Sequence, residues 1–344
     1  MWTLPKLKTG DLVEVRSRDE ILATLDAEGS LGGMPFMPEM LQYCGRQFAV
    51  AGVAHKTCDT AYRTGARKLN RMVHLNGTRC DGSAHGNCEA DCNLFWREEW
   101  LRAVSSTASG NSQNRTARPA NGCAEKRLHE LTQVTPYGCG STAYRCQATR
   151  LFAASSPLDW WDVRQYVHDI RTGNHGSRQV IRVLWLAGIY QLMKLPFGYR
   201  MFHRLYAWMH QRLTGRPPPH ITGIIPQGTA TPAESLNLEP GELVKIKQAS
   251  EIGATLNVAN RNRGMYFDVE EVAYCGKTFP VRRRATRIID ERSGHMLSLR
   301  NPCIILENVV CPGHYSEGRL LCPRAITPYW RENWLERAGP RREP

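Results

Sequence analysis

Five cysteines and one histidine in the first 92 residues have the residue types and spacing of a metal site. Cys80, Cys88 and Cys92 follow one another with seven and three residues between them, and His85 lies inside the first interval. No CxxC pair occurs in the chain, which argues against a zinc ribbon and against a thioredoxin-like redox pair. Four thiolates would nevertheless suit either tetrahedral zinc or an iron–sulfur cluster, so the sequence indicates a metal without naming it.

An internal repeat helps to choose among these cysteines. Residues 10–80 match residues 241–311 at a constant offset of 231, with GDLVEV against GELVKI and YCGRQF against YCGKTF. Beyond Cys80, three extra residues in the later copy align Cys88 with Cys322 and WREEWL with WRENWL. The chain therefore contains two copies of one module, the first module at residues 1–104 and a degenerate second module at residues 236–344.

The second module lacks two of the thiols. Ile289 stands where the first module has Cys58, and Ile326 stands where it has Cys92. A paired loss of this kind is expected if both cysteines serve one site that the second module does not build. The predicted ligands are therefore Cys58, Cys80, Cys88 and Cys92, with His85 in reserve and with Cys311, Cys322 and Cys303 as weaker candidates.

Other interpretations of the cysteines stay open. Cys44 and Cys275 lie in matched YCG turns and are better explained as buried structural thiols. The whole cluster could also consist of reduced, packed cysteines, and six disulfides would require an exported protein. Because the N-terminal residues MWTLPKLKTG lack an apolar signal-peptide core, we expect a cytoplasmic protein, with attachment at the membrane periphery as the second option.

The elements that must position these residues are small strands and one helix. Short β-rich runs punctuated by Gly and Pro favour an α+β fold with two repeated small SH3-like β-barrels. Each barrel should carry a Cys-rich loop and close with a Trp helix, which in the first module spans residues 95–104 with Trp96 and Trp100 on one face. Residues 105–122 have the composition of a linker, and residues 123–235 form a mainly helical, basic middle region.

The middle region carries most of the charge asymmetry. The chain has a net charge of +13, and residues 150–220 contain ten Lys or Arg against three Asp. This surplus suits an anionic partner, either nucleic acid or an anionic membrane surface, and a solvated basic surface is the alternative. Residues 183–193 form an uncharged run that is too short to span a bilayer. They could lie in a membrane interface or pack as a helical hairpin against the modules.

The functional hypotheses come from three classes. The first is a metal-binding protein with an accessory or redox role in a biosynthetic pathway. The second is a basic nucleic-acid-binding protein built on SH3/KOW-like barrels. Catalysis is undecided, since no P-loop, GxSxG or HExxH motif occurs and only Cys146, with His129 or His168, offers a nucleophile.

Four segments also carry a resemblance to known proteins. HKTCDT, RCDGSAHGNC and FWREEWL in the first module, with CPRAITPYWRENWLERA in the second, resemble a bacterial family of tandem Cys-rich modules with no established activity. Some of its members are encoded near genes for polysaccharide or natural-product biosynthesis. The resemblance implies the tandem architecture and a bacterial origin, and it implies no reaction.

Overall fold

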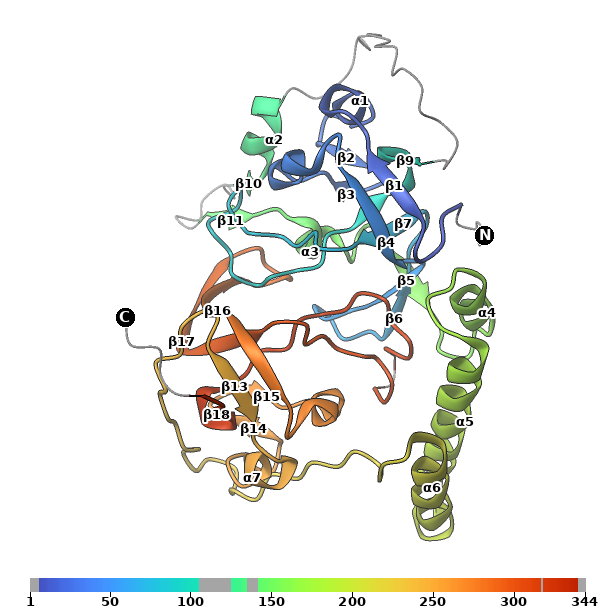
Figure 1. Ribbon diagram of the computed structural model, residues 1–344, viewed down its shortest axis with the longest axis vertical. Coiled ribbons are helices and arrows are strands. Elements are labelled where there is room, and N and C mark those ends of the chain that lie inside the picture. Colours follow the sequence, from blue (N-terminus) through green and yellow to red (C-terminus); the bar gives the residue numbers. More distant parts are fainter. Residues whose placement is uncertain (1–5, 105–124, 135–141, 317, 340–344) are drawn as a thin grey trace. The chain divides into compact units, whose positions relative to one another are not determined.

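The structure, a computed structural model, describes residues 6–104, 125–134, 142–316 and 318–339. It combines helices with several small β-sheets (Figure 1). The chain divides into two compact units, each assembled from distant segments of the sequence. Unit 1 comprises Met1–Gly176, Arg287–Ser298 and Cys322–Arg324, and unit 2 comprises Ser177–Thr286, Leu299–Leu321 and Ala325–Pro344. The predicted middle region is therefore divided between the two units, while the predicted linker 105–122 lies outside the described residues.

Unit 1 is built on an antiparallel sheet with the order β8-β7-β4-β1-β9. Unit 1 also contains a second sheet, in the order β12-β6-β5, and two short hairpins, β2–β3 and β10–β11. The strands of unit 1 are β1 Leu12–Val15, β2 Ser30–Leu31, β3 Met34–Pro35, β4 Gln47–Val53, β5 Lys56–Cys58, β6 Ala66–Lys68, β7 Met72–Leu75, β8 Trp96–Arg97, β9 Leu101–Ala103, β10 Gln133–Val134, β11 Ala143–Tyr144 and β12 Ser156–Leu158. Its helices are α1 Arg18–Leu22, η1 Pro38–Tyr43, η2 Glu98–Trp100, α2 Glu125–Leu131, α3 Gln147–Arg150 and α4 Arg164–Arg171.

Unit 2 has a four-stranded sheet with the order β17-β16-β13-β18 and a long helical hairpin. Two of its strands, β16 and β17, extend into the segment assigned to unit 1. The strands are β13 Leu243–Ile246, β14 Arg261–Asn262, β15 Met265–Tyr266, β16 Thr278–Ile289, β17 Met296–Leu306 and β18 Leu335–Arg337. The helices are α5 Ser177–Met193, α6 Gly198–Thr214, α7 Ala249–Gly253, η3 Val269–Tyr274 and η4 Glu332–Trp334.

The cores of the two units contain aromatic clusters of the same geometry. In unit 1, Phe36 packs edge to face on Trp100, with ring centroids 5.1 Å apart. In unit 2, Phe267 packs in the same way on Trp334, at 5.2 Å. Each of these indoles also donates a hydrogen bond from Nε1 to a threonine hydroxyl, because a buried indole N–H needs an acceptor. Matched residues of the two sequence copies thus occupy matched positions in their own cores.

The prediction of a closing Trp helix is wrong. Trp96 lies in strand β8 and Trp100 ends the three-residue 3₁₀ helix η2, after which β9 begins at Leu101. The backbone on either side of the turn is used in the sheet, since Val73 pairs with Trp96 and Val15 pairs with Leu101. Too few residues are left for an α-helix, and both tryptophans reach the core from a strand–turn–strand path.

The helices expected between residues 157 and 214 are present as α4, α5 and α6. Helix α4 begins later than its sequence pattern indicates, because Pro157 and Leu158 belong to strand β12. It is held to the rest of unit 1 by a buried ion pair, in which Lys56 Nζ lies 2.6 Å from Asp169 Oδ2. His55 Nε2 lies 3.3 Å from the other oxygen of the same carboxylate. Among the described residues, no helix is long and apolar enough to cross a membrane.

Candidate metal centre

The loop between β7 and β8 carries the Cys-rich segment and folds back on itself. The backbone N–H of Cys80 donates to the carbonyl oxygen of Cys92 at 2.9 Å, and Arg79 and Asn93 form an isolated antiparallel bridge. Gly82 makes the return possible. Its φ is +74°, and a Cβ at this position would lie 2.0 Å from the carbonyl oxygen of Cys88. The tight turn brings the side chain of His85 back towards Cys80.

Three donor atoms converge where this loop meets the 3₁₀ helix η1. Cys80 Sγ lies 3.4 Å from Glu39 Oε1 and 3.4 Å from His85 Nε2. His85 Nδ1 lies 3.4 Å from Glu39 Oε1. One ligand atom from each residue lies within 4.8 Å of the others, and no other group of three or more His, Cys, Asp or Glu side chains in the described part of the chain does so. Glu39 and His85 are buried, and Cys80 is half-buried.

The electrostatics of this group are those of donors held out of water. Burial raises the pKa of Glu39 to about 7 and lowers the pKa of His85 to about 4. Burial, followed by the charge of Glu39, raises the pKa of Cys80 well above its usual range. Two buried atoms, Glu39 Oε2 and His85 Nδ1, make no hydrogen bond. Buried polar atoms normally have hydrogen-bond partners, so these two atoms are available to bind a further group.

No protein-family model matches this chain, and no curated protein matches it. Matched residues nevertheless recur within the chain, 231 positions apart.

Unit 2 shows a different environment for the carboxylate at the position that matches Glu39. Glu270, the counterpart of Glu39, accepts backbone hydrogen bonds from His314 at 2.9 Å, Tyr315 at 2.7 Å and Ser316 at 2.8 Å. The loop of unit 2 that corresponds to the Cys-rich loop is three residues longer, and its backbone N–H groups surround the Glu270 carboxylate. The shorter loop of unit 1 offers Glu39 a thiol and an imidazole in their place.

The four predicted cysteine ligands are not brought together at ligand distance. Cys80 belongs to the group described above, as does the reserve residue His85, whereas Cys58, Cys88 and Cys92 do not. Cys58 ends strand β5, and its carbonyl oxygen accepts a hydrogen bond from Arg324. The Cys88 thiol accepts one from the backbone N–H of Ile289, within unit 1.

Cys92 stays close to the group without joining it. Its thiol and that of Cys146 lie near enough to contribute, after burial and Glu39, to the raised pKa of Cys80. Burial raises the pKa of Cys92 beyond the normal range. Burial also raises the pKa of Cys146 to about 12, the opposite of the depressed pKa of a nucleophilic cysteine. Cys146 is part of the core of unit 1, and this environment argues against the sequence hypothesis of a Cys146 nucleophile.

The weaker candidates of the second module lie apart from any such group in the described residues. Cys303 is buried in unit 2, where its thiol lies 3.6 Å from the sulfur of Met265. Cys311 repeats the backbone bond of its counterpart, since its N–H donates to the carbonyl oxygen of Ile326 at 2.8 Å. Cys322 belongs to unit 1 and lies near Lys56.

Sequence reasoning missed Glu39. It stands 41 residues before Cys80, in a segment interpreted only as strands, and a lone Glu in such a segment carries no ligand signal. The signal that could have found it is the repeat, because Glu39 and Glu270 keep an acidic residue four positions before both YCG turns. A carboxylate that is present in a largely buried stretch of both copies needs a hydrogen-bond donor or a cation as its partner.

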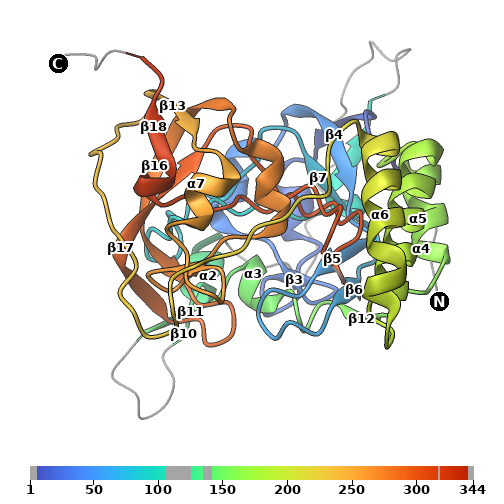
Figure 2. The ribbon, with the colours of Figure 1, turned by 90° about the horizontal axis from the view of Figure 1, so that it is seen from below.

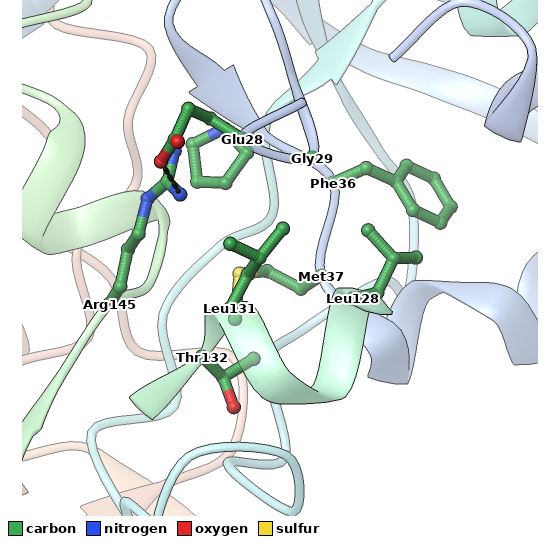
Figure 3. A pocket seen from close by; sticks show the side chains of 9 residues that line it. Glu28, Gly29, Phe36, Met37, Leu128, Leu131, Thr132 and Arg145 are labelled. Carbon is green, nitrogen blue, oxygen red and sulfur yellow. Dashed lines mark hydrogen bonds and ion pairs between the residues drawn. The ribbon is translucent and has the colours of Figure 1, made fainter. Parts of the chain in front are cut away.

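A pocket of unit 1 lies beside the Cys-rich loop between β7 and β8 (Figure 3). Its wall is apolar, with Phe36 and Met37 on one side and Leu128 and Leu131 of α2 on the other. Arg145 closes one edge through an ion pair with Glu28 at 3.1 Å. None of the three metal-centre residues lines this pocket, although Thr132 at its rim donates a hydrogen bond to the carbonyl oxygen of Ala84 in the Cys-rich loop.

Proposed function

We propose that this protein binds one divalent metal ion in unit 1, with Glu39, Cys80 and His85 as its protein ligands. The observation that carries the proposal is the convergence of three different donors, two of which keep a buried atom without a hydrogen bond. A bound cation would satisfy those atoms and stabilise the deprotonated thiol and carboxylate. His85, whose pKa is lowered, is already the neutral imidazole that a metal requires.

The donor set favours zinc. One thiolate, one imidazole and one carboxylate all belong to the zinc repertoire, and three protein ligands leave a fourth position for water or a further group. An iron–sulfur cluster would instead draw on cysteine thiolates, which is the four-thiol alternative of Cys58, Cys80, Cys88 and Cys92. The two alternatives differ in acid-labile sulfide as well as in the metal.

The role that follows is to fix the Cys-rich loop. The loop has few regular backbone bonds of its own, and a metal joining Cys80 and His85 to η1 would tie it to the β-sheet. Metal binding would then be coupled to the order of this part of unit 1. We include in the proposal that residues 1–104 and 236–344 are two copies of one SH3-like module, of which only the first builds the site. An accessory role in a biosynthetic pathway is the context that the family resemblance suggests.

The test is metal analysis of the full-length protein, purified without oxygen, with sulfide determination and cobalt substitution. We expect about one equivalent of zinc per chain. Cys80→Ser, His85→Gln and Glu39→Gln should each lower it, and Cys80→Ser should abolish the thiolate-to-cobalt absorption. The matched control is Cys311→Ser, which makes the same chemical change at the corresponding position of unit 2 and should leave the metal in place.

Three results would contradict the proposal. Zinc retained by all three variants would exclude these ligands. Iron with sulfide, lost from Cys58→Ser and Cys88→Ser as well, would replace the proposed set by the four-thiol set. A protein purified anaerobically without stoichiometric metal, and unable to take up zinc or cobalt, would leave the group as packed polar side chains. Circular dichroism of each variant separates loss of metal from loss of fold.

A further inference from the structure

The helical hairpin of unit 2 has an apolar face that the described structure leaves uncovered. Helices α5 and α6 pack side by side (Figure 2) and run antiparallel. Two contacts fix their register: Arg182 donates to the carbonyl oxygen of Leu213 at 3.3 Å, and Trp185 Nε1 lies 3.3 Å from the sulfur of Met209.

One side of the hairpin is occupied by unit 2 itself. His210 Nε2 lies 3.2 Å from the hydroxyl of Tyr315, and Gln179 Nε2 lies 3.2 Å from His314 Nε2. The buried residues of α5 recur every three residues and include Val180, Val183, Leu186 and Ile189. The hairpin therefore packs against the rest of unit 2 through a defined inner side.

The opposite side carries large apolar side chains in water. The exposed positions of α5 include the series 181, 185, 188 and 192, and those of α6 include 201, 205, 208 and 212, in which 188 is a glycine and 212 an arginine and the other six are apolar. Both series have the 4-3-4 spacing of a single helix stripe. On each helix the stripe lies about a quarter turn away from the side that contacts the other helix. Viewed along each helix from its own N-terminus, the direction of that turn is the same. In an antiparallel pair both stripes therefore lie on the same side of the hairpin.

The side chains of this face are unusually exposed for their size. Trp185 is 59% exposed and Trp208 is 61% exposed, while Met201 reaches 69% and Phe197, in the connecting turn, reaches 82%. Isolated exposed apolar residues are common, but large apolar residues gathered on one side of two adjacent helices indicate an interaction surface. We define the hairpin face as Ile181, Trp185 and Leu192 of α5 together with Met201, Leu205 and Trp208 of α6.

The charge around the hairpin face indicates what covers it. Between Ser177 and Thr214 the chain has five Arg and one Lys and has no Asp or Glu. Arg200 and Arg204 lie on the outer edge of α6, where they are exposed, and Arg212 ends the apolar stripe. Apolar side chains in the middle with cations at the margins are the pattern of a helix that lies in the interface of an anionic membrane.

We propose that the hairpin face inserts into the headgroup region of anionic lipid bilayers and holds the protein at the membrane surface. Each helix has 17 residues, about 25 Å of length, which suits helices lying flat in the interface. Nucleic acid fits less well, because phosphates would contact the basic margins and leave the large apolar surface in water. The proposal is independent of the metal centre, whose residues all belong to unit 1.

The test is sedimentation of the full-length protein with lipid vesicles. We expect binding to vesicles of phosphatidylcholine with about one third phosphatidylglycerol, weak binding to phosphatidylcholine alone, and weaker binding at high salt. The Trp fluorescence should shift to the blue on binding. Met201→Ser with Trp208→Ser should abolish sedimentation, whereas Ile224→Ser with Val258→Ser, a matched pair of exposed apolar residues elsewhere in unit 2, should not.

The charges are tested separately, with Arg200→Gln and Arg204→Gln together. Loss of two interfacial cations should weaken binding to the anionic vesicles by about 30-fold. Three results would overturn the proposal. The first is no binding to anionic vesicles at low salt. The second is equal binding by the Met201 and Trp208 variant. The third is a stable dimer that this variant dissociates, which would make a second copy of the chain the occupant of the face.

Discussion

Zinc binding to the metal-free protein should release a number of protons that falls as the pH rises. The reason is that the three proposed ligands titrate in different ranges. Burial holds the Cys80 thiol protonated throughout the neutral range and keeps His85 neutral above about pH 4. Glu39 is different, because burial places its pKa at about 7. The variant Glu39→Gln isolates the contribution of Glu39 to the proton release, because glutamine has nearly the same shape as glutamate and does not titrate.

The expected numbers follow from these pKa values. At pH 7 Glu39 is half protonated, so binding should release about 1.5 protons, about one from Cys80 and about half of one from Glu39. At pH 6 the total should rise to about 1.9, and at pH 8.5 it should fall to about 1.0. Glu39→Gln should bind zinc more weakly and release about one proton at all three pH values.

The assay is calorimetric titration of zinc into chelator-treated protein, in buffers that differ in ionisation enthalpy. The slope of the apparent enthalpy against buffer enthalpy gives the protons released. A wild-type release that is the same at pH 6 and pH 8.5 would refute the reasoning, because it would mean that Glu39 does not exchange a proton for the metal. A Glu39→Gln release that falls with pH, as in the wild type, would assign the titration to another group.

The same pKa has a consequence for the metal-free fold. Because Glu39 binds its proton more tightly in the folded protein than in the unfolded chain, the free energy of unfolding should fall as pH rises from about 4.5 to about 7. Glu39→Gln should remove that part of the fall. Urea denaturation of the chelator-treated proteins at pH 5 and pH 7.5 measures the difference.

Two further predictions concern stability. Lys56→Met removes the cationic partner of the buried Asp169 carboxylate, leaves the His55 imidazole beside it, and should lower the free energy of unfolding by about 3–5 kcal/mol, whereas adding Asp169→Leu should recover much of the loss; urea denaturation in which the double variant is as unstable as the single one would contradict this. Gly82→Ala and Gly77→Ala both place a side chain at φ +74°, which costs about 1–2 kcal/mol, but only Gly82 also has the backbone of Cys88 within 3 Å of the new Cβ. Thermal denaturation should therefore show a larger loss for Gly82→Ala, with loss of zinc as well, and equal losses would argue against the tight turn.

The amino-acid sequence determines the local patterns of this protein. Apolar residues at helical spacing identify α5 and α6 because that periodicity is a property of neighbouring residues. Residues that recur at an offset of 231 also predict corresponding local elements, and η1 and η3 indeed begin 231 positions apart. The tryptophans are expected in the core, and both Trp96 and Trp100 are fully buried. The spacing of these two residues did not fix their backbone, since two indoles four positions apart can point inward from a helix or from a strand and a 3₁₀ turn.

Only the tertiary structure decides which donors meet. Cys80 and His85 are close in the sequence, but Glu39 reaches them from η1, and its proximity depends on how the loop after β7 closes. Cysteine spacing indicates metal chemistry without stating which sulfur atoms converge, and the three-residue difference between the two loops leaves Glu39 beside a thiol and Glu270 among backbone N–H groups. The sequence therefore determines the kinds of donors, and the folded chain decides the site, because a donor group is defined by distances between residues that are far apart along the chain.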